Sequence, residues 1–240
     1  MILAFDTSTD WLTIALGSGD NIIAELNEAA PRAHLSRLLP GIDALMKQAR
    51  ISVADIDYIA VGIGPGSFTG LRIAVATAQG LAHGLNRPLI GVSTLDAVAV
   101  GTASAAEGGA AGRPADGDIH PVLEAKRHEV YTAGYDQDGR RLTDYQVLFP
   151  DRLADTLAGA GRPVILTGDG LIQYAPVFRE RLGALAAFAD RSLWYPRASV
   201  LIRLVEEKIE TGEIEPYFKI LPLYIRLADA EEGLKREKSS

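Results

Sequence analysis

The chain opens with Ile2-Leu3-Ala4-Phe5-Asp6-Thr7-Ser8-Thr9-Asp10, a short apolar run that ends in a turn of acids and hydroxyls. Two further apolar stretches follow at Trp11–Gly17 and Asn21–Leu26, with Ser18-Gly19-Asp20 between them. Apolar runs of this length between turn-forming residues are typical of strands joined by tight turns. The opening therefore predicts three successive strands.

The region after these strands predicts alternating helices and strands. Apolar residues recur at the three-and-four spacing of one helical face, at Leu35, Leu38, Leu39, Ile42, Leu45, Met46 and Ala49. A strand is expected at Asp57–Ile63, and a second helix from the glycine-rich turn after it to about His83. Pro88–Val92 predicts a further strand, and Ser93 is placed to cap a third helix.

The second half repeats this order in outline. Apolar patterning predicts strands near Ile119–Ala125, Glu129–Asp136, Gln146–Phe149 and Val164–Thr167, with helices near Arg152–Ala158 and Ser199–Thr211. Three strands, helix, strand, helix, occurring twice, indicates a duplicated α/β unit.

The boundary between the two units is expected in a stretch poor in apolar bulk. Eleven of the 17 positions in 101–117 are Gly or Ala, which predicts a lobe boundary or a mobile loop. The expected division is a first lobe at 1–105 and a second at 106–240. The last helix could pack back on the first lobe.

Composition limits the classes of function. The net charge is −7 and both halves are acidic, with six basic against nine acidic side chains in 1–105. Unaided binding to RNA depends on Lys and Arg neutralising phosphates, so another chain should supply most of any RNA-binding surface. The chain contains no cysteine, which excludes disulfides, thiolate catalysis and cysteine zinc sites. No apolar run approaches the ~20 residues that span a bilayer, and the N-terminus carries no basic leader, so no membrane association and a cytoplasmic location are expected.

Two turns of the first half are candidate phosphate sites. Hydroxyls and amides at Asp6, Thr7 and Ser8 can hold a phosphate, and the carboxylate can hold a metal-bound water. The alternative is a turn in which Asp and Ser bond their own backbone.

The second turn comprises Gly64-Pro65-Gly66-Ser67-Phe68-Thr69-Gly70-Leu71-Arg72, where glycines permit close approach and Ser67 or Thr69 can cap a helix. It lacks the Lys-Ser/Thr ending of a Walker A loop and the central Ser of a hydrolase elbow. Close strand-to-helix packing explains this turn as well as ligand binding does.

The helix after this turn is a candidate docking surface. From Phe68 to Leu81 its only charged residue is Arg72, and Gly70, Ala74 and Ala78 form a ridge of small residues at spacing four. A helix that is apolar nearly all round should be buried all round, by neighbouring helices or by another chain. The expected partner or dimer interface comprises His34, Leu35, Leu38, Gly70, Ala74, Ala78 and Leu81.

No metal centre is expected from the histidines. The four are His34, His83, His120 and His128, and no pair has the spacing of a helical metal site.

These motifs together resemble the TsaB family, also known as YeaZ. The resemblance lies in the two turns above, in Ala78-Gln79-Gly80-Leu81-Ala82 and in Gly91-Val92-Ser93-Thr94-Leu95. It includes Pro31-Arg32-Ala33-His34 with Leu38-Leu39-Pro40, and continues through Glu129-Val130-Tyr131 and Pro222-Leu223-Tyr224-Ile225-Arg226, so it covers nearly the full chain.

The resemblance implies an α/β actin/Hsp70/sugar-kinase-like (ASKHA) fold of two related lobes, each a mixed sheet flanked by helices. It implies a non-catalytic subunit that pairs with the TsaD transferase and the TsaE ATPase. In that system TsaD transfers a threonylcarbamoyl group to N6 of adenosine 37 in tRNA. ATP and metal would be used by the partner subunits, this chain would carry no cofactor of its own, and tRNA would be met through the complex. An isolated chain could form a homodimer through the same face.

The resemblance also locates what the chain has lost. Thr94 and Val98 stand where the paralogous TsaD carries its His-x-x-x-His metal ligands, and valine has no donor atom. The match weakens at Glu124, Lys126 and His128, which depart from the family pattern and put a ligand role for that turn in doubt. Gly168 and Gly170, with Asp6, Thr7, Ser8, Gly64, Gly66, Ser67 and Thr69, would then be vestigial nucleotide or phosphate loops.

Two other functions compete with this interpretation. A free-standing small-molecule kinase or ATPase of the same fold would use Asp6 to orient the attacking group, with Gly168-Asp169-Gly170 near the adenosine. A protease follows only from an old label of the family. The absence of both a zinc motif and a nucleophile elbow opposes it.

Overall fold

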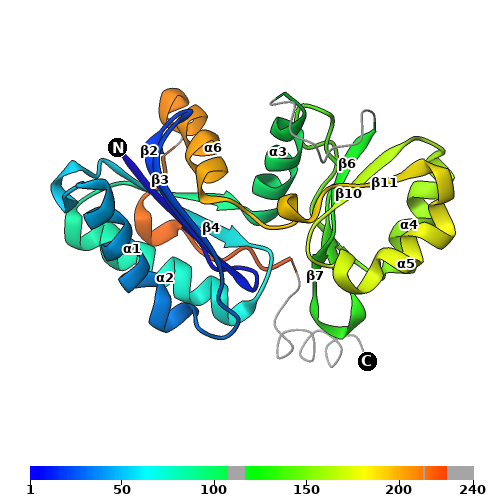
Figure 1. The fold of residues 1–240 in the computed structure, drawn as a ribbon, viewed down its shortest axis with the longest axis horizontal. Coiled ribbons are helices and arrows are strands. Elements are labelled where there is room, and N and C mark those ends of the chain that lie inside the picture. Colours follow the sequence, from blue (N-terminus) through cyan, green and yellow to red (C-terminus); the bar gives the residue numbers. More distant parts are fainter. Residues whose placement is uncertain (108–116, 213, 226–240) are drawn as a thin grey trace, which may run out of the picture.

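The computed structural model describes residues 1–107, 117–212 and 214–225, which form two lobes side by side (Figure 1). The first lobe is built on one five-stranded sheet in the order β3-β2-β1-β4-β5. Its strands are β1 (Ile2–Asp6), β2 (Trp11–Ser18), β3 (Asn21–Ala29), β4 (Tyr58–Gly64) and β5 (Leu89–Ser93). The first three strands pair antiparallel, whereas β1, β4 and β5 run parallel, so the sheet is mixed.

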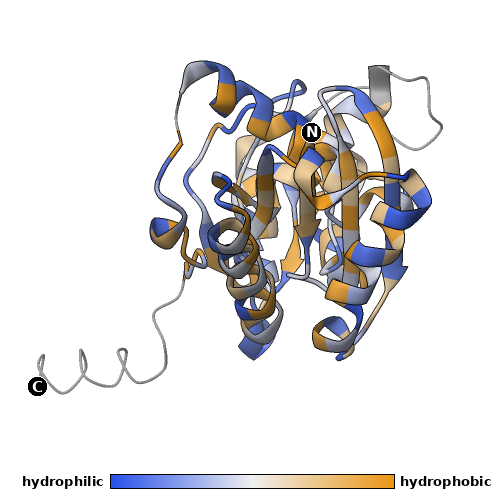
Figure 2. Cartoon of the chain, turned by 90° about the vertical axis from the view of Figure 1, so that its left-hand side faces the viewer, coloured by the Kyte–Doolittle hydropathy of each residue, from blue (hydrophilic) through white to orange (hydrophobic). Residues whose placement is uncertain are grey.

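Helices cover both faces of this sheet. On one face lie α1 (His34–Ala49) and α2 (Phe68–Leu85), which share an apolar cluster with Phe5, Ile14 and Val61. On the other face lies α6 (Ala198–Thr211), whose apolar side chains pack on Ala4 and Ala60. Figure 2 shows the strands of this lobe as largely hydrophobic and the surrounding helices as mixed, as expected when each helix buries one face.

The strands of the second lobe divide into two small sheets. Three parallel strands lie in the order β11-β10-β6, and three antiparallel strands in the order β7-β8-β9. An isolated bridge from Ile119 to Tyr135 joins them. The strands are β6 (Asp118–Pro121), β7 (Leu123–Glu124), β8 (Val130–Thr132), β9 (Gln146–Leu148), β10 (Val164–Thr167) and β11 (Ala186–Phe188). The helices α4 (Pro150–Ala160) and α5 (Leu171–Leu182) pack against each other on this lobe.

Helix α3 (Thr94–Glu107) links the lobes. It follows a first-lobe strand, yet Leu95, Val98 and Ala99 lie in a cluster with Ile119 and Ile165 of the second lobe. Helix α6, which follows the second-lobe elements, packs on the first sheet in return. A division of the chain at residue 105 therefore cuts across the packing, because each lobe contributes a helix to the other or to the boundary.

Five short 3-10 turns complete the described chain, at η1 (Val53–Asp55), η2 (Lys126–His128), η3 (Gly183–Leu185), η4 (Arg191–Leu193) and η5 (Tyr217–Lys219). After η5 the chain runs beside α2, where Gln79 Nε2 donates to the Ile220 carbonyl at 2.9 Å. Leu223 N donates to the Ile63 carbonyl at 2.7 Å, which fixes this segment at the end of β4.

The sequence pattern predicts the first-lobe order correctly but misses two second-lobe elements, α5 and β11. The Gly/Ala-rich stretch at 101–117 is not one loop, because α3 continues through its first seven residues. The remainder of that stretch, 108–116, lies outside the described residues. Within the described ranges, no helix combines the length and apolarity needed to cross a bilayer.

Candidate functional site

The turn after β1 is closed by its own hydrogen bonds. Ser8 N donates to Asp6 Oδ1 at 2.5 Å, and Trp11 N donates to Thr9 Oγ1 at 3.2 Å. Asp6, Thr7 and Ser8 are all buried. This is the arrangement in which an Asp bonds backbone two residues on, the alternative to ligand binding that the sequence leaves open.

The glycine-rich loop sits directly on this turn. Ser67 N donates to the Ser8 carbonyl at 2.7 Å, and Thr7 Oγ1 donates to the Gly70 carbonyl at 2.7 Å. A Cβ at Gly66 would overlap Ser8, and one at Gly70 would overlap the Thr7 carbonyl, so only glycine permits this approach. The two candidate phosphate loops thus contact each other.

The glycine-rich loop also supplies a hydrogen-bond acceptor to the first turn of α2. Gly70 N donates to Ser67 Oγ at 3.3 Å, so Ser67 is the N-cap that the sequence suggests, while Thr69 is exposed. Gly64 has a φ of +102°, and a Cβ at this position would meet the Leu71 side chain. The loop therefore lies directly on the first turn of α2. The amides of Ser67, Gly70 and Leu71 therefore bond groups of the protein itself.

Thr94 and His34 join the same buried cluster. Thr94 Oγ1 lies 3.1 Å from Asp6 Oδ2 and 2.9 Å from Ser8 Oγ, and His34 Nε2 lies 2.9 Å from the Thr9 carbonyl. Burial raises the pKa of the Asp6 carboxyl, and its bonds to Ser8 and Thr94 and the nearby His34 act in the opposite direction. Val98, one turn further along α3, lies in an apolar cluster.

The second lobe has a matching close contact. Gly170 N donates to the Val122 carbonyl at 2.9 Å, and a Cβ at either Gly168 or Gly170 would meet that same carbonyl. Asp169 accepts a hydrogen bond from Glu124 N at 3.0 Å. Burial raises the pKa of the Asp169 carboxyl to about 6, and the charges of Glu124 and Asp10 act in the same direction. Asp10 belongs to the first-lobe turn, so the two turns lie near enough to interact electrostatically between the lobes.

The described residues contain no group of three or more His, Asp or Glu side chains placed to hold a metal ion. The second-lobe turn carries Lys126 and His128 exposed at its tip, beside the exposed Glu124.

The predicted docking ridge proves to be core. Ala74 and Ala78 are wholly inaccessible in the apolar cluster with the lobe's own sheet, and Gly70 is buried on the Thr7 carbonyl. His34 and Leu38 are buried as well, and Leu81 is half-buried. The buried members of the set are inaccessible to a partner in this conformation, because small residues at spacing four let α2 approach the strands closely. For Leu35 and Leu81 the interface stays a prediction. Leu35 alone of that set is strongly exposed, at 77%.

Several apolar side chains of α1, α2 and the segment after η5 do face solvent. Four of them, Leu35 and Leu39 of α1, Phe68 of α2 and Tyr224 after η5, are called here the outer face. The Phe68 and Tyr224 rings lie 5.6 Å apart, and the Arg72 guanidinium lies 3.8 Å from the Phe68 ring centre. The predicted set omits Phe68 and Tyr224, although exposed aromatics beside an Arg are a typical interface signal.

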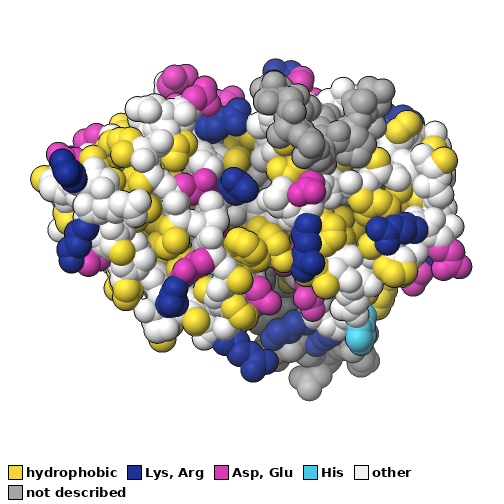
Figure 3. Space-filling view, viewed as in Figure 1, with side chains coloured by type: hydrophobic (Ala, Val, Ile, Leu, Met, Phe, Trp, Pro, Cys, Tyr) yellow, Lys and Arg dark blue, Asp and Glu magenta, His cyan; other side chains and the backbone are white. Residues whose placement is uncertain are grey.

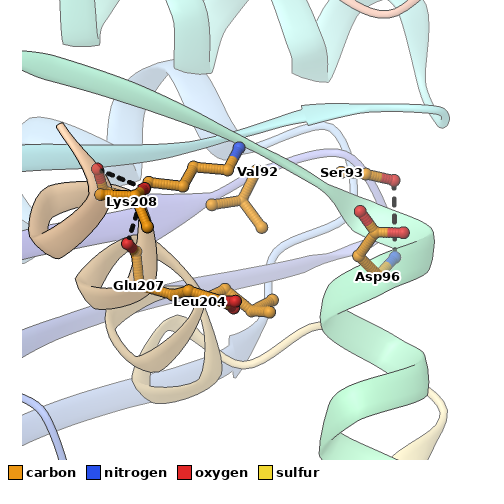
Figure 4. Close-up of a pocket in the computed structure, with 7 residues that line it drawn as sticks. Val92, Ser93, Asp96, Leu204, Glu207 and Lys208 are labelled. Atoms are coloured by element: carbon orange, nitrogen blue, oxygen red, sulfur yellow. Dashed lines mark hydrogen bonds between the residues drawn. The ribbon is translucent and has the colours of Figure 1, made fainter. Parts of the chain in front are cut away.

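The opposite side of the first lobe carries a small cavity of about 250 Å³ between β5, α3 and α6 (Figure 4). Ser93, Asp96 and Lys208 line it. Asp96 accepts hydrogen bonds from Tyr135 and Tyr145, each at 2.7 Å, so its carboxylate ties α3 to the second lobe. On the described part of the face in Figure 3, Lys and Arg side chains alternate with Asp and Glu rather than forming a continuous basic surface.

Comparison with known proteins gives consistent results. The family model described as TsaD, tRNA N6-adenosine threonylcarbamoyltransferase, matches residues 22–233. The Escherichia coli tRNA threonylcarbamoyladenosine biosynthesis protein TsaB is 40% identical, with 94% of each chain covered. The Bacillus subtilis protein of the same name is 34% identical, with 96% of each chain covered.

Comparison with solved structures supports the same family and gives the fold. YeaZ from Pseudomonas aeruginosa superposes with a TM-score of 0.75 at 32% identity, covering 93% of this chain and 99% of its own. A ROK hexokinase from Thermus thermophilus has a TM-score of 0.50 at 11% identity, over 86% of this chain and 99% of its own, a similarity of fold alone. The chain therefore has the two-lobed actin- and sugar-kinase-like fold. It belongs to the TsaB (YeaZ) family of tRNA threonylcarbamoyladenosine biosynthesis proteins.

Proposed function

We propose that this chain is a non-catalytic subunit for forming N6-threonylcarbamoyladenosine at position 37 of tRNA, and that it pairs with a TsaD-family transferase and a TsaE-family ATPase. The observation that carries the proposal is the direct contact of the two loops. Ser67 N and Thr7 Oγ1 bond across that contact at 2.7 Å each, so these two candidate phosphate donors are already paired within the protein. On this proposal the chain provides a docking surface for its partners and does not itself catalyse a reaction.

The position of the expected metal ligands supports the same function. The Thr94 hydroxyl is engaged with Asp6 and Ser8, and Val98 packs in the core. Val98 has no donor atom, and the Thr94 hydroxyl already takes part in hydrogen bonds within the protein. On this proposal the ATP, the metal and the reacting groups belong to partner subunits, and the chain needs no cofactor of its own.

The partner would dock on the outer face. Leu39 is 52% exposed, Phe68 42% and Tyr224 47%, and together with Leu35 they present apolar surface on neighbouring helices. Apolar and aromatic side chains around an Arg are enriched at the centres of protein interfaces. The same face would allow a homodimer when the partner is absent.

The acidic composition favours a role in which another subunit makes most of the contacts to RNA. With a net charge of −7, the chain would meet tRNA through the assembled complex. A cytoplasmic location follows from that role.

Two measurements separate this function from a kinase or ATPase of the same fold. Titration calorimetry with ATP and Mg²⁺ should detect no micromolar binding by the isolated chain, and a coupled assay no turnover. Mixing with a TsaD-family protein should give a stable complex by size-exclusion chromatography with light scattering. ATP turnover by the isolated chain would contradict the proposal.

A further inference from the structure

Arg72 is the only charged residue of α2 between Phe68 and Leu81, and its side chain is exposed. Its guanidinium lies 3.8 Å from the centre of the Phe68 ring. Its Nε donates to the Tyr224 hydroxyl at 3.4 Å, and the Phe68 and Tyr224 rings lie 5.6 Å apart. Arg72 therefore contacts both aromatic side chains of the outer face.

The closing segment holds Tyr224 in this position, because it returns to the first lobe after η5 (Figure 1). Leu223 N donates to the Ile63 carbonyl at 2.7 Å, which fixes the residue before Tyr224 at the end of β4. The long Arg72 side chain is thus restricted at two points, by the Phe68 ring and by the hydroxyl at its Nε. A side chain that is ordered before binding loses less entropy when an interface forms.

The rest of the Arg72 guanidinium is free within the part of the chain that the structure describes. Among those residues, no hydrogen bond or ion pair involves its Nη atoms. The Nη atoms present N–H groups in the planar, forked geometry that fits both oxygens of a carboxylate. An exposed guanidinium held in this way is suited to bind the side chain of Asp or Glu.

A protein that docks on the outer face would cover Arg72 together with the two rings. A charge that is removed from water without a counter-charge weakens an interface strongly. A second copy of the chain does not supply that counter-charge from the same helices. The one acidic residue of α1 and α2 is Asp43, and its carboxylate pairs with Lys47 at 2.7 Å. Self-pairing through these helices would therefore bury Arg72 without a partner.

We propose that Arg72 binds a carboxylate of the partner protein, an Asp or Glu side chain within its apolar contact surface, and that this pair selects the partner over a second copy of the chain. The inference rests on the proposed function, since the partner is the TsaD-family protein that docks on the outer face. It adds the chemistry which that protein must present. The same guanidinium strengthens one complex and opposes the other, which is how a single residue gives specificity.

A purely structural role for Arg72 makes a different prediction. Its guanidinium could serve only to cover the Phe68 ring, as arginine side chains do on aromatic surfaces. Methionine would then replace it without loss of binding, because a thioether also packs well on aromatic rings. If Arg72 binds a carboxylate, methionine instead leaves that carboxylate buried and unpaired.

The test measures two equilibria of the full-length chain, binding to an immobilised TsaD-family protein by surface plasmon resonance and self-association by analytical ultracentrifugation. Arg72→Met should raise the Kd for the partner at least about thirtyfold, because a carboxylate loses its counter-charge. Arg72→Lys should raise it about tenfold, because an ammonium does not hold both oxygens in a fork. Arg72→Met should leave self-association unchanged or tighten it. The control Arg152→Met, at an exposed position of α4, should change neither equilibrium.

Charge reversal identifies the carboxylate. Arg72→Glu should abolish binding to the partner, since two carboxylates would then face each other in the interface. Each Asp and Glu of the partner is replaced in turn by Arg, and one of these changes should restore binding to Arg72→Glu at least about tenfold.

Wild-type affinity in Arg72→Met, or the absence of any restoring position in the partner, would overturn the proposal. Self-association that is weakened by Arg72→Met would overturn it as well, because a second copy would then supply the carboxylate. These results differ from a failure of the proposed function, in which the wild-type chain does not bind the TsaD-family protein at all. Loss of binding in Leu35→Asp with wild-type affinity in Arg72→Met would leave docking on the outer face intact and remove only the carboxylate.

Discussion

Replacement of Leu35 by Asp tests the outer face most sharply. Leu35 follows His34 at the start of α1, and its side chain is 77% exposed. Substitutions at exposed positions away from caps and pairs change the free energy of unfolding by about 0.5 kcal/mol or less. The variant should therefore fold as the wild type does.

The effect on pairing should be much larger. Burying a whole leucine side chain contributes about 1.5–3 kcal/mol, and about three quarters of that remains to be gained at Leu35. Loss of this contribution, about 1.1–2.3 kcal/mol, corresponds to a roughly seven- to fiftyfold rise in Kd. An unpaired carboxylate buried in the interface adds to the cost, so Leu35→Asp should raise Kd about a hundredfold or more.

The assay is surface plasmon resonance with an immobilised TsaD-family partner, with the far-UV circular dichroism of each variant as a fold check. Ile172→Asp, at a position 59% exposed on α5 of the second lobe, is the matched control and should bind as the wild type does. Equal Kd values for wild type and Leu35→Asp would refute docking on the outer face.

Three further predictions concern stability. Ala78→Arg should unfold the protein in thermal denaturation, because its site is wholly buried against the sheet; a folded variant with wild-type Tm would contradict the packing of α2. Gly70→Ala should destabilise the protein by about 1–3 kcal/mol in urea denaturation, because the new Cβ meets the Thr7 carbonyl. Gly80→Ala, with open space around it, should stabilise the protein by about 0.5–1 kcal/mol. Equal effects of the two substitutions would refute the contact between the loops. Folding raises the pKa of the Asp169 carboxyl from 3.8 to about 6, so its ionisation lowers the free energy of unfolding as pH rises through that range. Asp169→Asn should therefore be more stable than wild type above pH 6, by up to about 3 kcal/mol, and equal to it below about pH 4. A stability difference that does not depend on pH would refute the burial argument.

The first lobe could be predicted from sequence because its signals are local. Strand lengths, turn residues and the apolar face of α1 all appear in short windows. The missed helix α5 has the spacing of a helix at Leu171, Tyr174 and Phe178. However, it has no side-chain cap and contains Pro176, which obscure its bounds.

The docking ridge shows a limit of periodicity. A stripe such as Gly70, Ala74 and Ala78 indicates that a helix face is buried closely, and it does not say against what. Here the cover is the lobe's own sheet. The contact of Thr94 with Asp6 links positions 88 residues apart, so no local pattern contains it.

On the proposed function, this chain provides a docking surface and no catalytic group for the modification of tRNA. Its most direct test is reconstitution with TsaD- and TsaE-family proteins, the threonylcarbamoyl donor, ATP and unmodified tRNA, with and without this chain, followed by mass spectrometry of the nucleosides. We expect threonylcarbamoyladenosine only when the chain is present. Thr94→Val, which removes the hydroxyl beside Asp6 and leaves the outer face intact, should retain activity wherever the variant folds. Full modification in the absence of the chain would refute the proposed function.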